Sequence, residues 1–578
     1  MYAGSPMAAS IEPFLRMRSA ALVGHLPSGE LAYLSDQTGS FQLYVARADG
    51  LHDQLTFGED RVTGALPSGV DERIVLARDI GGNERHALAC LDAVSGRELA
   101  LTHDPEAIHS PGAFSPDGST FAFTHTGRNG VDFDLALVGI DGSGRRELAQ
   151  LEGACVACDW SERGILLWRM NTPFDHDLFL VDPADGRLEH LTPHDSETSY
   201  ESPRLLADGL VACACDAGGQ FTRLAILAAG AAPEFRTPDD ADVEHVRVDD
   251  TRVHIAYVVN RGGPSELWLD GMRLEGLPRG VYGPPELARD GRIAVTVAAF
   301  ADTTDVWSVP GPVRLSRSAS GGVDRASLRE PEPRDFESFD GRRIPYLLYG
   351  EPGRPTLCFV HGGPESQYRG SLNPVVAYLV SRGIAVAAPN VRGSTGYGRD
   401  YHHLDDVALR LDSVHDLAML ARSLGAGAGV PVAVMGGSYG GYMTMAAITE
   451  HPELWAAAVN IVGIVNFVTF LERTGAYRRA LREAEYGSLE SDRELLERIS
   501  PIHKVARIAC PLMVVHGAND PRVPVSEAEQ IVSAVRERGG EVAYLRYDDE
   551  GHGITRLRNR LDCYPQISAF LERHLGLV

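Results

Sequence analysis

The first 320 residues contain one short pattern seven times. Each copy is a polar turn, usually with glycine, followed by a β-rich apolar run, and the turns are centred at Gly29, Gly69, Gly118, Gly164, Gly209, Thr251 and Gly291. Successive turns lie 40 to 49 residues apart, close to the length of one four-stranded propeller blade. A β-sandwich array does not usually repeat one length seven times. The repeat therefore predicts a seven-bladed β-propeller over residues 22–320.

The segments before and after the repeats have different patterns. Residues 11–21 look helical, with Pro13 near their start, so a helical segment is expected within residues 1–21. A polar connector with Gly and Pro at residues 316–334 marks a domain boundary. Beyond it, β-rich runs alternate with helical stretches, which predicts a mostly parallel sheet with helices on both faces. An α/β domain is thus expected over residues 321–578.

Charge and composition exclude several classes of protein. The formal net charge is -25 and no Lys/Arg-rich run offsets it, so nucleic acid is not expected as a partner. Residues 1–10 have neither the basic region nor the apolar core of a secretory leader, so the expected location is cytoplasmic. The longest nearly apolar stretch, residues 455–471, is interrupted by polar residues and by glycine. It is expected to be a buried strand with its following loop, and no membrane partner is predicted.

Four of the eight cysteines form two close pairs, Cys155 with Cys158 and Cys213 with Cys215. Four thiols could hold zinc, but the second pair lies inside an apolar strand and the two pairs fall in different repeats. Small buried core residues are the favoured interpretation, with a redox-labile pair as the alternative. No metal and no other cofactor is predicted.

A G-x-S-x-G motif follows an apolar strand and precedes a helical stretch. It spans residues 436–440 and places Ser438 at its centre. This strand–turn–helix context is typical of a nucleophile elbow, in which small residues permit a tight turn that exposes the serine hydroxyl. A glycine-rich connection with a capping serine is the alternative. The context favours Ser438 as a nucleophile.

A serine hydroxyl needs an imidazole base, and the imidazole needs a carboxylate to fix its tautomer. Asp520 comes directly after the strand-like run 512–515, and His552 follows the run 542–547, in the order Ser, acid, His. Asp548, Asp549 and Glu550 are nearer to His552 in sequence but lack this strand-end context. Six other histidines of this half are expected to be structural or exposed: His361, His402, His403, His415, His503 and His516.

The oxyanion of a tetrahedral intermediate needs two hydrogen-bond donors. The backbone N–H of Tyr439, which follows the nucleophile, is one candidate. The second is expected in the loop after the strand-like run 356–360, which reads His-Gly-Gly-Pro. Because Pro364 has no N–H, Gly363 is the best donor there.

Five ordered motifs make the chain resemble the prolyl oligopeptidase family of serine peptidases, in particular its acylaminoacyl peptidase branch. They are HGGP (361–364), NVRGSTGYG (390–398), GGSYGGY (436–442), HGANDPRVP (516–524) and EGHG (550–553). The resemblance implies a seven-bladed propeller joined to an α/β-hydrolase domain, with an N-terminal helix packed on the latter. It also implies that Ser438, Asp520 and His552 form a catalytic triad, that Gly363 and Tyr439 form the oxyanion hole, and that the propeller admits oligopeptides and screens out folded proteins.

Two departures from related branches bear on the substrate. The prolyl-specific and dipeptidyl branches carry a Tyr hydroxyl where this chain has His361, and no Glu-Glu dipeptide occurs to grip a free α-amine. Capture of a free N-terminus is therefore weakly disfavoured. Arg522, which matches the family's Arg after the catalytic Asp, is expected either to bind an acyl carbonyl or carboxylate or to form a structural salt bridge. Phe467 and Phe470 are expected either to wall the S1 pocket or to lie in the core.

Together these features predict a serine exopeptidase that cleaves short peptides, most simply by releasing an N-acylated residue. One alternative is a carboxypeptidase-type or esterase activity of the same triad, with an arginine gripping a substrate carboxylate. A second alternative, from a different class of function, is a propeller scaffold whose α/β-hydrolase half is catalytically inert. Oligopeptides are the expected partners, and a homo-oligomer is plausible because the last strand of the sheet offers an edge.

Overall fold

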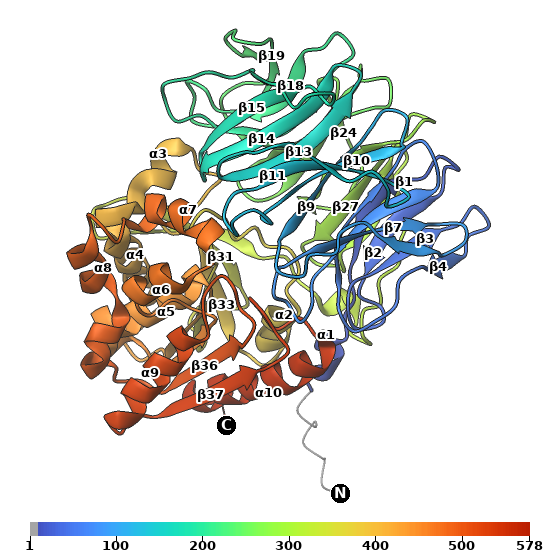
Figure 1. Cartoon of the computed structure of the whole chain (residues 1–578). Coiled ribbons are helices and arrows are strands. Elements are labelled where there is room, and N and C mark those ends of the chain that lie inside the picture. The colour runs from blue at the N-terminus through green and yellow to red at the C-terminus, as the bar shows by residue number, and fades with distance from the viewer. Residues whose placement is uncertain (1–9, 578) are drawn as a thin grey trace, which may run out of the picture.

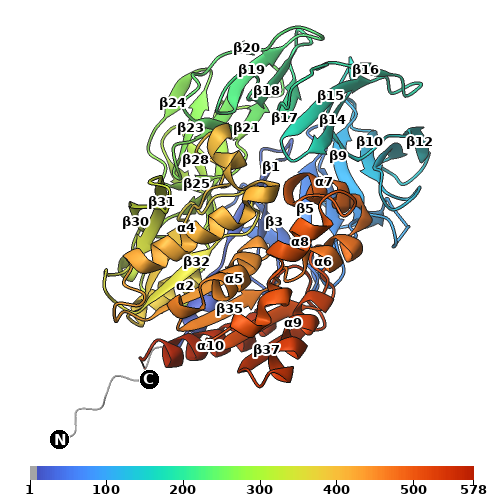
Figure 2. The same cartoon turned by 90° about the vertical axis from the view of Figure 1, so that its left-hand side faces the viewer.

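The computed structural model describes residues 10–577. Within this range, the first part of the chain forms seven small antiparallel sheets, six with four strands and one with five. They are arranged as the blades of a β-propeller, which confirms the predicted fold (Figures 1 and 2). The second part forms one eight-stranded sheet flanked by helices, here called the α/β domain.

The first four blades consist of β1 (Ala20–His25), β2 (Leu31–Ser35), β3 (Gln42–Ala46) and β4 (His52–Gln54); β5 (Val62–Pro67), β6 (Arg73–Arg78), β7 (Ala87–Asp92) and β8 (Glu98–Ala100); β9 (His109–Phe114), β10 (Thr120–His125), β11 (Asp134–Gly139) and β12 (Arg146–Ala149); and β13 (Ala154–Ser161), β14 (Gly164–Thr172), β15 (Asp175–Val181) and β16 (Leu188–His190). The last three consist of β17 (Tyr200–Leu205), β18 (Val211–Cys215), β19 (Arg223–Leu227) and β20 (Glu234–Phe235); β21 (Asp242–Val248), β22 (Ile255–Asn260), β23 (Ser265–Leu269) and β24 (Met272–Leu274); and β25 (Gly280–Tyr282), β26 (Glu286–Leu287), β27 (Ile293–Ala299), β28 (Asp305–Val309) and β29 (Val313–Arg314).

In blades 1 to 6 the repeated turn connects the first strand to the second. In blade 7 it connects β26 to β27. Gly29 precedes β2 and Gly118 precedes β10, and both glycines adopt positive φ, of 86° and 70°, which a residue with a side chain rarely adopts. Blade 1 packs against blade 7 through Tyr33, Ala294 and Val306. Within residues 10–577, each blade is built from one continuous segment and no strand is exchanged between the first and last blades, so side-chain packing closes the ring.

The predicted N-terminal helix is much shorter than expected. Helix α1 covers only Glu12–Leu15, and residues 20 and 21 already belong to β1. The helix cannot continue because the Arg18 N–H donates to the carbonyl of Ala319 in the connector, at 2.9 Å. Phe14 packs edge-on against Tyr378 of the α/β domain, with ring centroids 5.7 Å apart. Residues 1–9 of the expected segment lie outside the described residues.

The α/β domain has the strand order β30-β31-β33-β32-β34-β35-β36-β37. The pairs β30–β31 and β31–β33 are antiparallel and the other five are parallel. The strands are β30 (Glu332–Glu337), β31 (Arg343–Tyr349), β32 (Thr356–Val360), β33 (Ala385–Pro389), β34 (Val432–Gly437), β35 (Ala457–Ile461), β36 (Leu512–Gly517) and β37 (Val542–Tyr547). This is the mostly parallel sheet that the sequence predicts.

Helices cover both faces of this sheet because its parallel strands are apolar on both sides. The helices are α2 (Pro374–Ser381), α3 (Arg399–His402), α4 (Arg410–Ser423), α5 (Tyr439–Glu450), α6 (Phe467–Arg473), α7 (Ala476–Tyr486), α8 (Arg493–Ile499), α9 (Ser526–Glu537) and α10 (Leu557–His574). Short 3-10 turns occur at Arg325–Ser327, His403–Asp405, Val407–Leu409, Pro452–Leu454 and Pro501–Arg507. One core joins α4, α5, α8 and α9, and a second joins α1, α2 and α10.

Residues 455–471 contain more regular structure than predicted. They form β35 and a short loop, but a helix, α6, begins at Phe467. Asn466 caps this helix by accepting hydrogen bonds from the N–H groups of Val468 and Thr469. Among residues 10–577, no helix combines the length and apolar character needed to cross a bilayer.

Three of the four paired cysteines, Cys155, Cys213 and Cys215, lie in two propeller cores, as the favoured interpretation predicts. Cys155, Cys213 and Cys215 are buried, Cys158 is partly buried, and all four are free thiols. Burial raises the pKa of Cys155 to about 12 and that of Cys158 to about 11, so these thiols stay protonated near neutral pH. At the other end of the molecule, β37 forms an edge of the large sheet, and the homo-oligomer expected from that edge stays a prediction.

Candidate active site

The turn between β34 and α5 holds Ser438 in a strained conformation. Its φ is 57°, in the left-handed region that residues other than glycine seldom occupy. The glycines on either side are required by close packing: a Cβ on Gly436 would lie 2.3 Å from the carbonyl oxygen of Gly440, and one on Gly440 would lie 2.3 Å from that of Val360. The turn therefore has the geometry of a nucleophile elbow.

The structure brings Ser438 together with His552 and Asp520. Oγ of Ser438 lies 2.9 Å from Nε2 of His552, and Nδ1 of His552 lies 2.7 Å from Oδ2 of Asp520. The other carboxylate oxygen of Asp520 accepts the N–H groups of Arg522 and Val523, at 2.8 and 3.0 Å. These two bonds fix the carboxylate so that it faces the imidazole. The three side chains come from the loops after β34, β36 and β37, at one edge of the sheet.

The acids that are nearer to His552 in sequence have other contacts. Asp548 is 85% exposed on its loop. Asn559 of α10 donates to both Asp549 and Glu550, and Arg558 forms an ion pair with Asp549. Asp549 and Glu550 thus hold the loop that carries His552 through their contacts with α10.

Two further histidines near this edge have structural contacts. Nε2 of His516 lies 2.8 Å from the carbonyl oxygen of Val523, and burial lowers the pKa of this imidazole. His361 is bonded to Oγ of Ser394 and to the carbonyl oxygen of Gly362, and burial lowers its pKa as well. Both rings are therefore neutral at neutral pH, and both support loops beside the site.

The expected oxyanion donors lie in the segments that border Ser438. Tyr439 is the first residue of α5, so its N–H has no acceptor within the helix. The loop after β32 packs on the nucleophile, since a Cβ on Gly362 would lie 3.4 Å from Cβ of Ser438. The next residue, Gly363, has a φ of 128°. Its backbone can therefore turn toward the site without a side chain in the way.

A buried charged network that the sequence did not reveal supports Tyr439. The Tyr439 hydroxyl donates to Asp405, at 2.8 Å, and Arg410 forms ion pairs with both Asp405 and Glu485. The Arg410 guanidinium also lies over the ring of Tyr439, 5.2 Å from its centroid. Burial raises the pKa of both Asp405 and Glu485, and the Arg410 guanidinium opposes both shifts. Arg410 is fully buried. Its guanidinium is the positive charge that Asp405 and Glu485 share.

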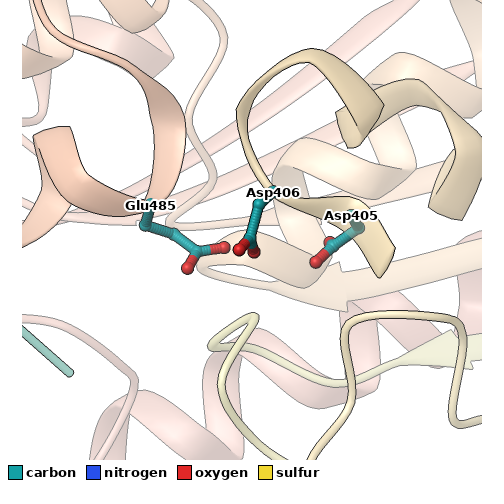
Figure 3. A group of neighbouring side chains, drawn as sticks. All are labelled: Asp405, Asp406 and Glu485. Atoms are coloured by element: carbon teal, nitrogen blue, oxygen red, sulfur yellow. The ribbon is translucent and has the colours of Figure 1, made fainter. Parts of the chain in front are cut away.

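Asp405, Asp406 and Glu485 also have carboxylate oxygens close enough to hold a metal ion (Figure 3). Two of the three already share the Arg410 guanidinium, whose Nη1 is 2.5 Å from Oδ2 of Asp405. A cation thus already occupies the acidic group. This arrangement does not fit a metal centre.

Phe467 and Phe470 do not form an open pocket wall. They are 0% and 3% exposed and belong to the core on the α5 side of the sheet. Phe467 packs against Tyr442 and Tyr486, with ring centroids 4.8 Å away in each case. Of the two interpretations of these side chains, packing in the core is the one whose contacts are present, and a role in the S1 pocket stays a prediction.

Arg522 makes an ion pair between the two halves of the molecule. Its Nε donates to Glu84 of the propeller, at 2.6 Å, while the arginine side chain stays 44% exposed. Of the two roles predicted for Arg522, the salt bridge is the one present. Glu84 was missed in the sequence because it lies in a propeller loop with no catalytic motif.

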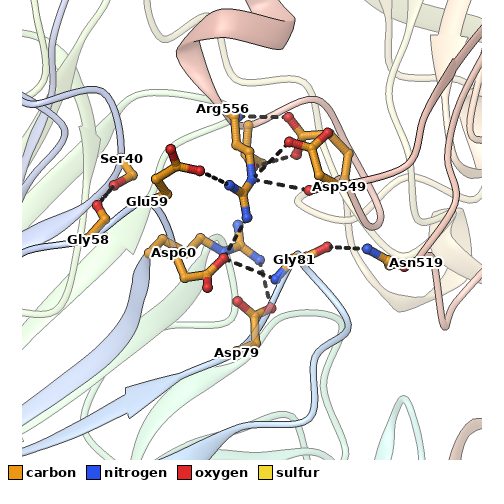
Figure 4. Close-up of polar contacts among 12 residues, drawn as sticks. Ser40, Gly58, Glu59, Asp60, Asp79, Gly81, Asn519, Asp549 and Arg556 are labelled. Carbon is orange, nitrogen blue, oxygen red and sulfur yellow. Dashed lines mark hydrogen bonds and ion pairs between the residues drawn. The ribbon is translucent and has the colours of Figure 1, made fainter.

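The same propeller loop, between β6 and β7, contacts the segments next to the acid and the base. Nδ2 of Asn519, which precedes Asp520, donates to the carbonyl of Gly81 at 3.1 Å. Arg556 reaches from the α/β domain to Glu59 and Asp60 of the propeller, and it also donates to the carbonyl of Asp549 (Figure 4). Docking of the propeller therefore supports both loops that carry the predicted acid and base.

A further close approach of the two halves, between Gly551 and Gly82, predicts an effect on activity. A Cβ on Gly551, next to His552, would lie 1.9 Å from the carbonyl oxygen of Gly82. Gly551→Ala should therefore displace the His552 loop or separate the domains there, and lower kcat/KM for a chromogenic ester by roughly 10- to 100-fold. Gly64→Ala is the matched control, because its Cβ would meet no atom closer than 3.9 Å. Equal activity of the two variants would contradict the prediction.

A histidine bridge predicts how pH affects the contact between the halves. His403 lies between Asp406, 2.7 Å away, and Glu197 of the propeller, 3.0 Å away, and these bonds raise its pKa from 6.5 to about 10. A raised pKa contributes stability that is complete below the unfolded value and is lost as pH rises toward the folded one. His403→Gln should therefore lower the melting temperature at pH 6 and have little effect near pH 10. A difference that does not depend on pH would contradict this prediction.

Residues 371–578 match the model of the prolyl oligopeptidase family. The chain is 35% identical to dipeptidyl peptidase family member 6 of Caenorhabditis elegans over 250 residues, which cover 41% of this chain and 34% of the relative. It is 28% identical to dipeptidyl aminopeptidase BIII of Pseudoxanthomonas mexicana over 483 residues, 81% of this chain and 60% of the relative. The human acylamino-acid-releasing enzyme is 28% identical over 240 residues, 38% of this chain and 32% of the relative.

The chain thus spans between about one third and three fifths of the length of these curated relatives, whose names cover more than one activity. A puromycin-hydrolyzing peptidase of Mycobacterium tuberculosis has a similar structure, with a TM-score of 0.87 at 20% identity over 99% of this chain and 97% of that one. This likeness shows that the two chains share a fold.

Proposed function

We propose that this chain is a serine peptidase that hydrolyses short peptides through an acyl-enzyme intermediate. The observation that supports this most strongly is the contact series from Ser438 through His552 to Asp520, with distances of 2.9 and 2.7 Å. Nδ1–H of His552 donates to Asp520, which leaves Nε2 free to accept the proton of Ser438. A serine paired in this way can attack a carbonyl carbon.

In the proposed reaction, Ser438 attacks the scissile carbonyl and His552 takes the hydroxyl proton. The N–H groups of Gly363 and Tyr439 stabilise the oxyanion. His552 then protonates the leaving amine, which departs and leaves the acyl group on Ser438. A water molecule, deprotonated by His552, attacks this ester, and the acid product is released as Ser438 regains its proton. Asp520 holds the imidazole in the required tautomer throughout and stabilises its positive charge.

A fluorophosphonate probe tests the mechanism. We expect it to label Ser438 in the wild-type protein and not in Ser438→Ala, with the site read by peptide mass spectrometry. Labelling at another residue, or an unreactive wild-type protein, would remove the mechanism and would favour the inert scaffold.

The finer proposal is release of an N-acylated residue, which the motifs of the acylaminoacyl branch and the similarity to the human acylamino-acid-releasing enzyme support. Cleavage of one peptide, offered free, N-acetylated and C-amidated, tests it by product mass. Preference for the acetylated form would support it. A requirement for the free carboxylate would instead support a carboxypeptidase-type activity, against which the pairing of Arg522 with Glu84 argues.

A further inference from the structure

Helix α7 contacts two of the loops that the proposed mechanism uses. Just before the helix, the Thr474 hydroxyl donates to the carbonyl of Arg522 at 2.9 Å, in the loop that carries the predicted acid. At the last residue of the helix, the Tyr486 hydroxyl lies 3.4 Å from the carbonyl oxygen of Gly363, whose N–H is a predicted oxyanion donor. The loop after β32, residues 361–366, is here called the oxyanion loop. Helix α7 is placed to hold it in a fixed relation to the triad.

A charged pair connects the same helix to the oxyanion loop. Nη1 of Arg482, one turn before Tyr486, lies 3.0 Å from Oε1 and 3.2 Å from Oε2 of Glu365. Glu365 follows Gly363 by two residues, and the two charged side chains are only 14% and 12% exposed. Burial by itself would lower the pKa of Arg482, but the charge of Glu365 raises it above its usual value. Among residues 10–577, each of these two charges has the other as its only ion-pair partner.

The oxyanion loop has little internal structure to hold it. It contains two adjacent glycines, Gly362 and Gly363, which have more backbone freedom than other residues, and Pro364 cannot donate a backbone hydrogen bond. From Gly363 to Glu365, the described part of the chain gives the loop no backbone-to-backbone hydrogen bond with another segment. The position of this part of the loop therefore depends on side chains, and α7 supplies both polar side-chain contacts described for it.

Helix α7 is itself anchored on two sides. Its Glu485 pairs with the buried Arg410, whose Nη1 also lies 3.1 Å from the hydroxyl of Tyr439, the residue of the other predicted oxyanion donor. Near its first turn, Tyr477 packs edge-on against Phe133 of the propeller, with ring centroids 6.1 Å apart. Figures 1 and 2 both show α7 where the two domains meet. Both predicted oxyanion donors thus have contacts that lead to one anchored helix.

We propose that Arg482 is a positioning residue for the reaction and that, through Glu365, it holds the Gly363 N–H where the oxyanion forms. The inference rests on the proposed peptidase mechanism and adds a residue on which its oxyanion hole depends. Displacement of a group in the active site by about 1 Å can cost about 100-fold in rate. Because Arg482 acts on the donor and not on the substrate, its loss should slow the chemical step more than it weakens substrate binding.

Steady-state kinetics on p-nitrophenyl butyrate test this role. Arg482→Met removes the cation but keeps an apolar stem, and it should lower kcat by roughly 10- to 100-fold while KM stays within about threefold. Arg482→Lys should recover most of the loss, because the guanidinium bonds Glu365 through Nη1 and an ammonium can replace that single contact. The control on the same helix is Arg479→Met. Arg479 donates to the carbonyl of Glu472 at 2.8 Å, and its variant should keep kcat within about twofold.

A double variant tests whether Arg482 acts through Glu365. Glu365→Gln removes the charge from the loop side of the pair and should also lower kcat. The double variant, Arg482→Met with Glu365→Gln, should have the kcat of the less active single variant, because both changes break one contact. Losses that multiply would show that the two residues act independently and would overturn the proposal.

Two other kinetic results would also contradict the positioning role. One is wild-type kcat in Arg482→Met and Glu365→Gln when their melting temperatures show that they are folded. The other is a raised KM with unchanged kcat, which would assign Arg482 to substrate binding. If Arg482→Met does not fold, kcat of Glu365→Gln decides the question in the same way.

Hydrogen exchange separates this proposal from the peptidase function, because it needs no hydrolysis. Exchange of the intact protein is read by mass spectrometry on peptides that contain residues 361–367. These amides should exchange about tenfold faster or more in Arg482→Met and Glu365→Gln than in the wild-type protein and Arg479→Met. Faster exchange would support the tether even if the wild-type protein hydrolyses no ester. Unchanged exchange in both variants would overturn the tether while leaving the hydrolytic mechanism intact.

Discussion

Replacing Asp520 by asparagine should lower kcat for peptide hydrolysis by about 10⁴-fold. Asp520 accepts from Nδ1 of His552 at 2.7 Å and is held by two backbone N–H groups. An amide in the same place cannot stabilise the imidazolium, and it can favour the tautomer that leaves Nε2 unable to take the serine proton. Steady-state kinetics on a p-nitroanilide peptide measure the effect, and Ser438→Ala should lower kcat at least as much.

The control for this prediction is Asp548→Asn. Asp548 is closer to His552 in sequence, but it is 85% exposed and forms an ion pair with Arg546. We expect this variant to keep kcat within about twofold, since exposed ion pairs contribute little. If Asp548→Asn lost activity and Asp520→Asn kept it, the assignment of the acid would be wrong.

Replacing Arg410 by methionine should destabilise the α/β domain by about 3–5 kcal/mol. The side chain is fully buried, and its loss would leave Asp405 and Glu485 buried without their shared cation. For a domain of this size, the melting temperature should fall by roughly 6–20 °C. Arg410→Lys should restore only part of the loss, because a single ammonium cannot reproduce the fork that bonds both acids.

Arg422→Met on the same helix, α4, is the matched control. Arg422 is 44% exposed and pairs with Glu453, which is 61% exposed. Its replacement should change the free energy of unfolding by about 1 kcal/mol or less. Differential scanning calorimetry of the two variants measures both effects. Equal melting temperatures would show that the buried network does not hold α4 and Tyr439 in place.

The sequence predicts the fold well where the signal is local. A propeller blade pairs strands that follow one another in the chain, so each blade leaves its own turn and apolar run in the sequence. The nucleophile elbow is equally local, because Gly436, Ser438 and Gly440 define one turn. Helix α1 is the exception: its pattern extends to residue 21, but contact with the connector ends the helix after Leu15.

The sequence predicts the candidate site less completely. It indicates Ser438, Asp520 and His552 because parallel strands end at one edge of a sheet, and the structure brings these three side chains into contact. It leaves two roles open for Phe467 and for Arg522, since periodicity and motif position do not show which neighbours a side chain meets. Glu84, Gly82 and the Arg410 network carry no motif and were missed.

By itself, the sequence determined the repeat number, the order of strands and helices, and the residues that end adjacent strands. These follow from spacing along the chain, which sets strand pairing and turn geometry. Only the tertiary structure decided which charges are balanced. Asp405 and Glu485 come from different segments of the chain, yet both form ion pairs with the Arg410 guanidinium. The electrostatic energy of a charged side chain depends on its distance from other charges and on how far it is buried from water. The order of residues in the sequence determines neither of these directly.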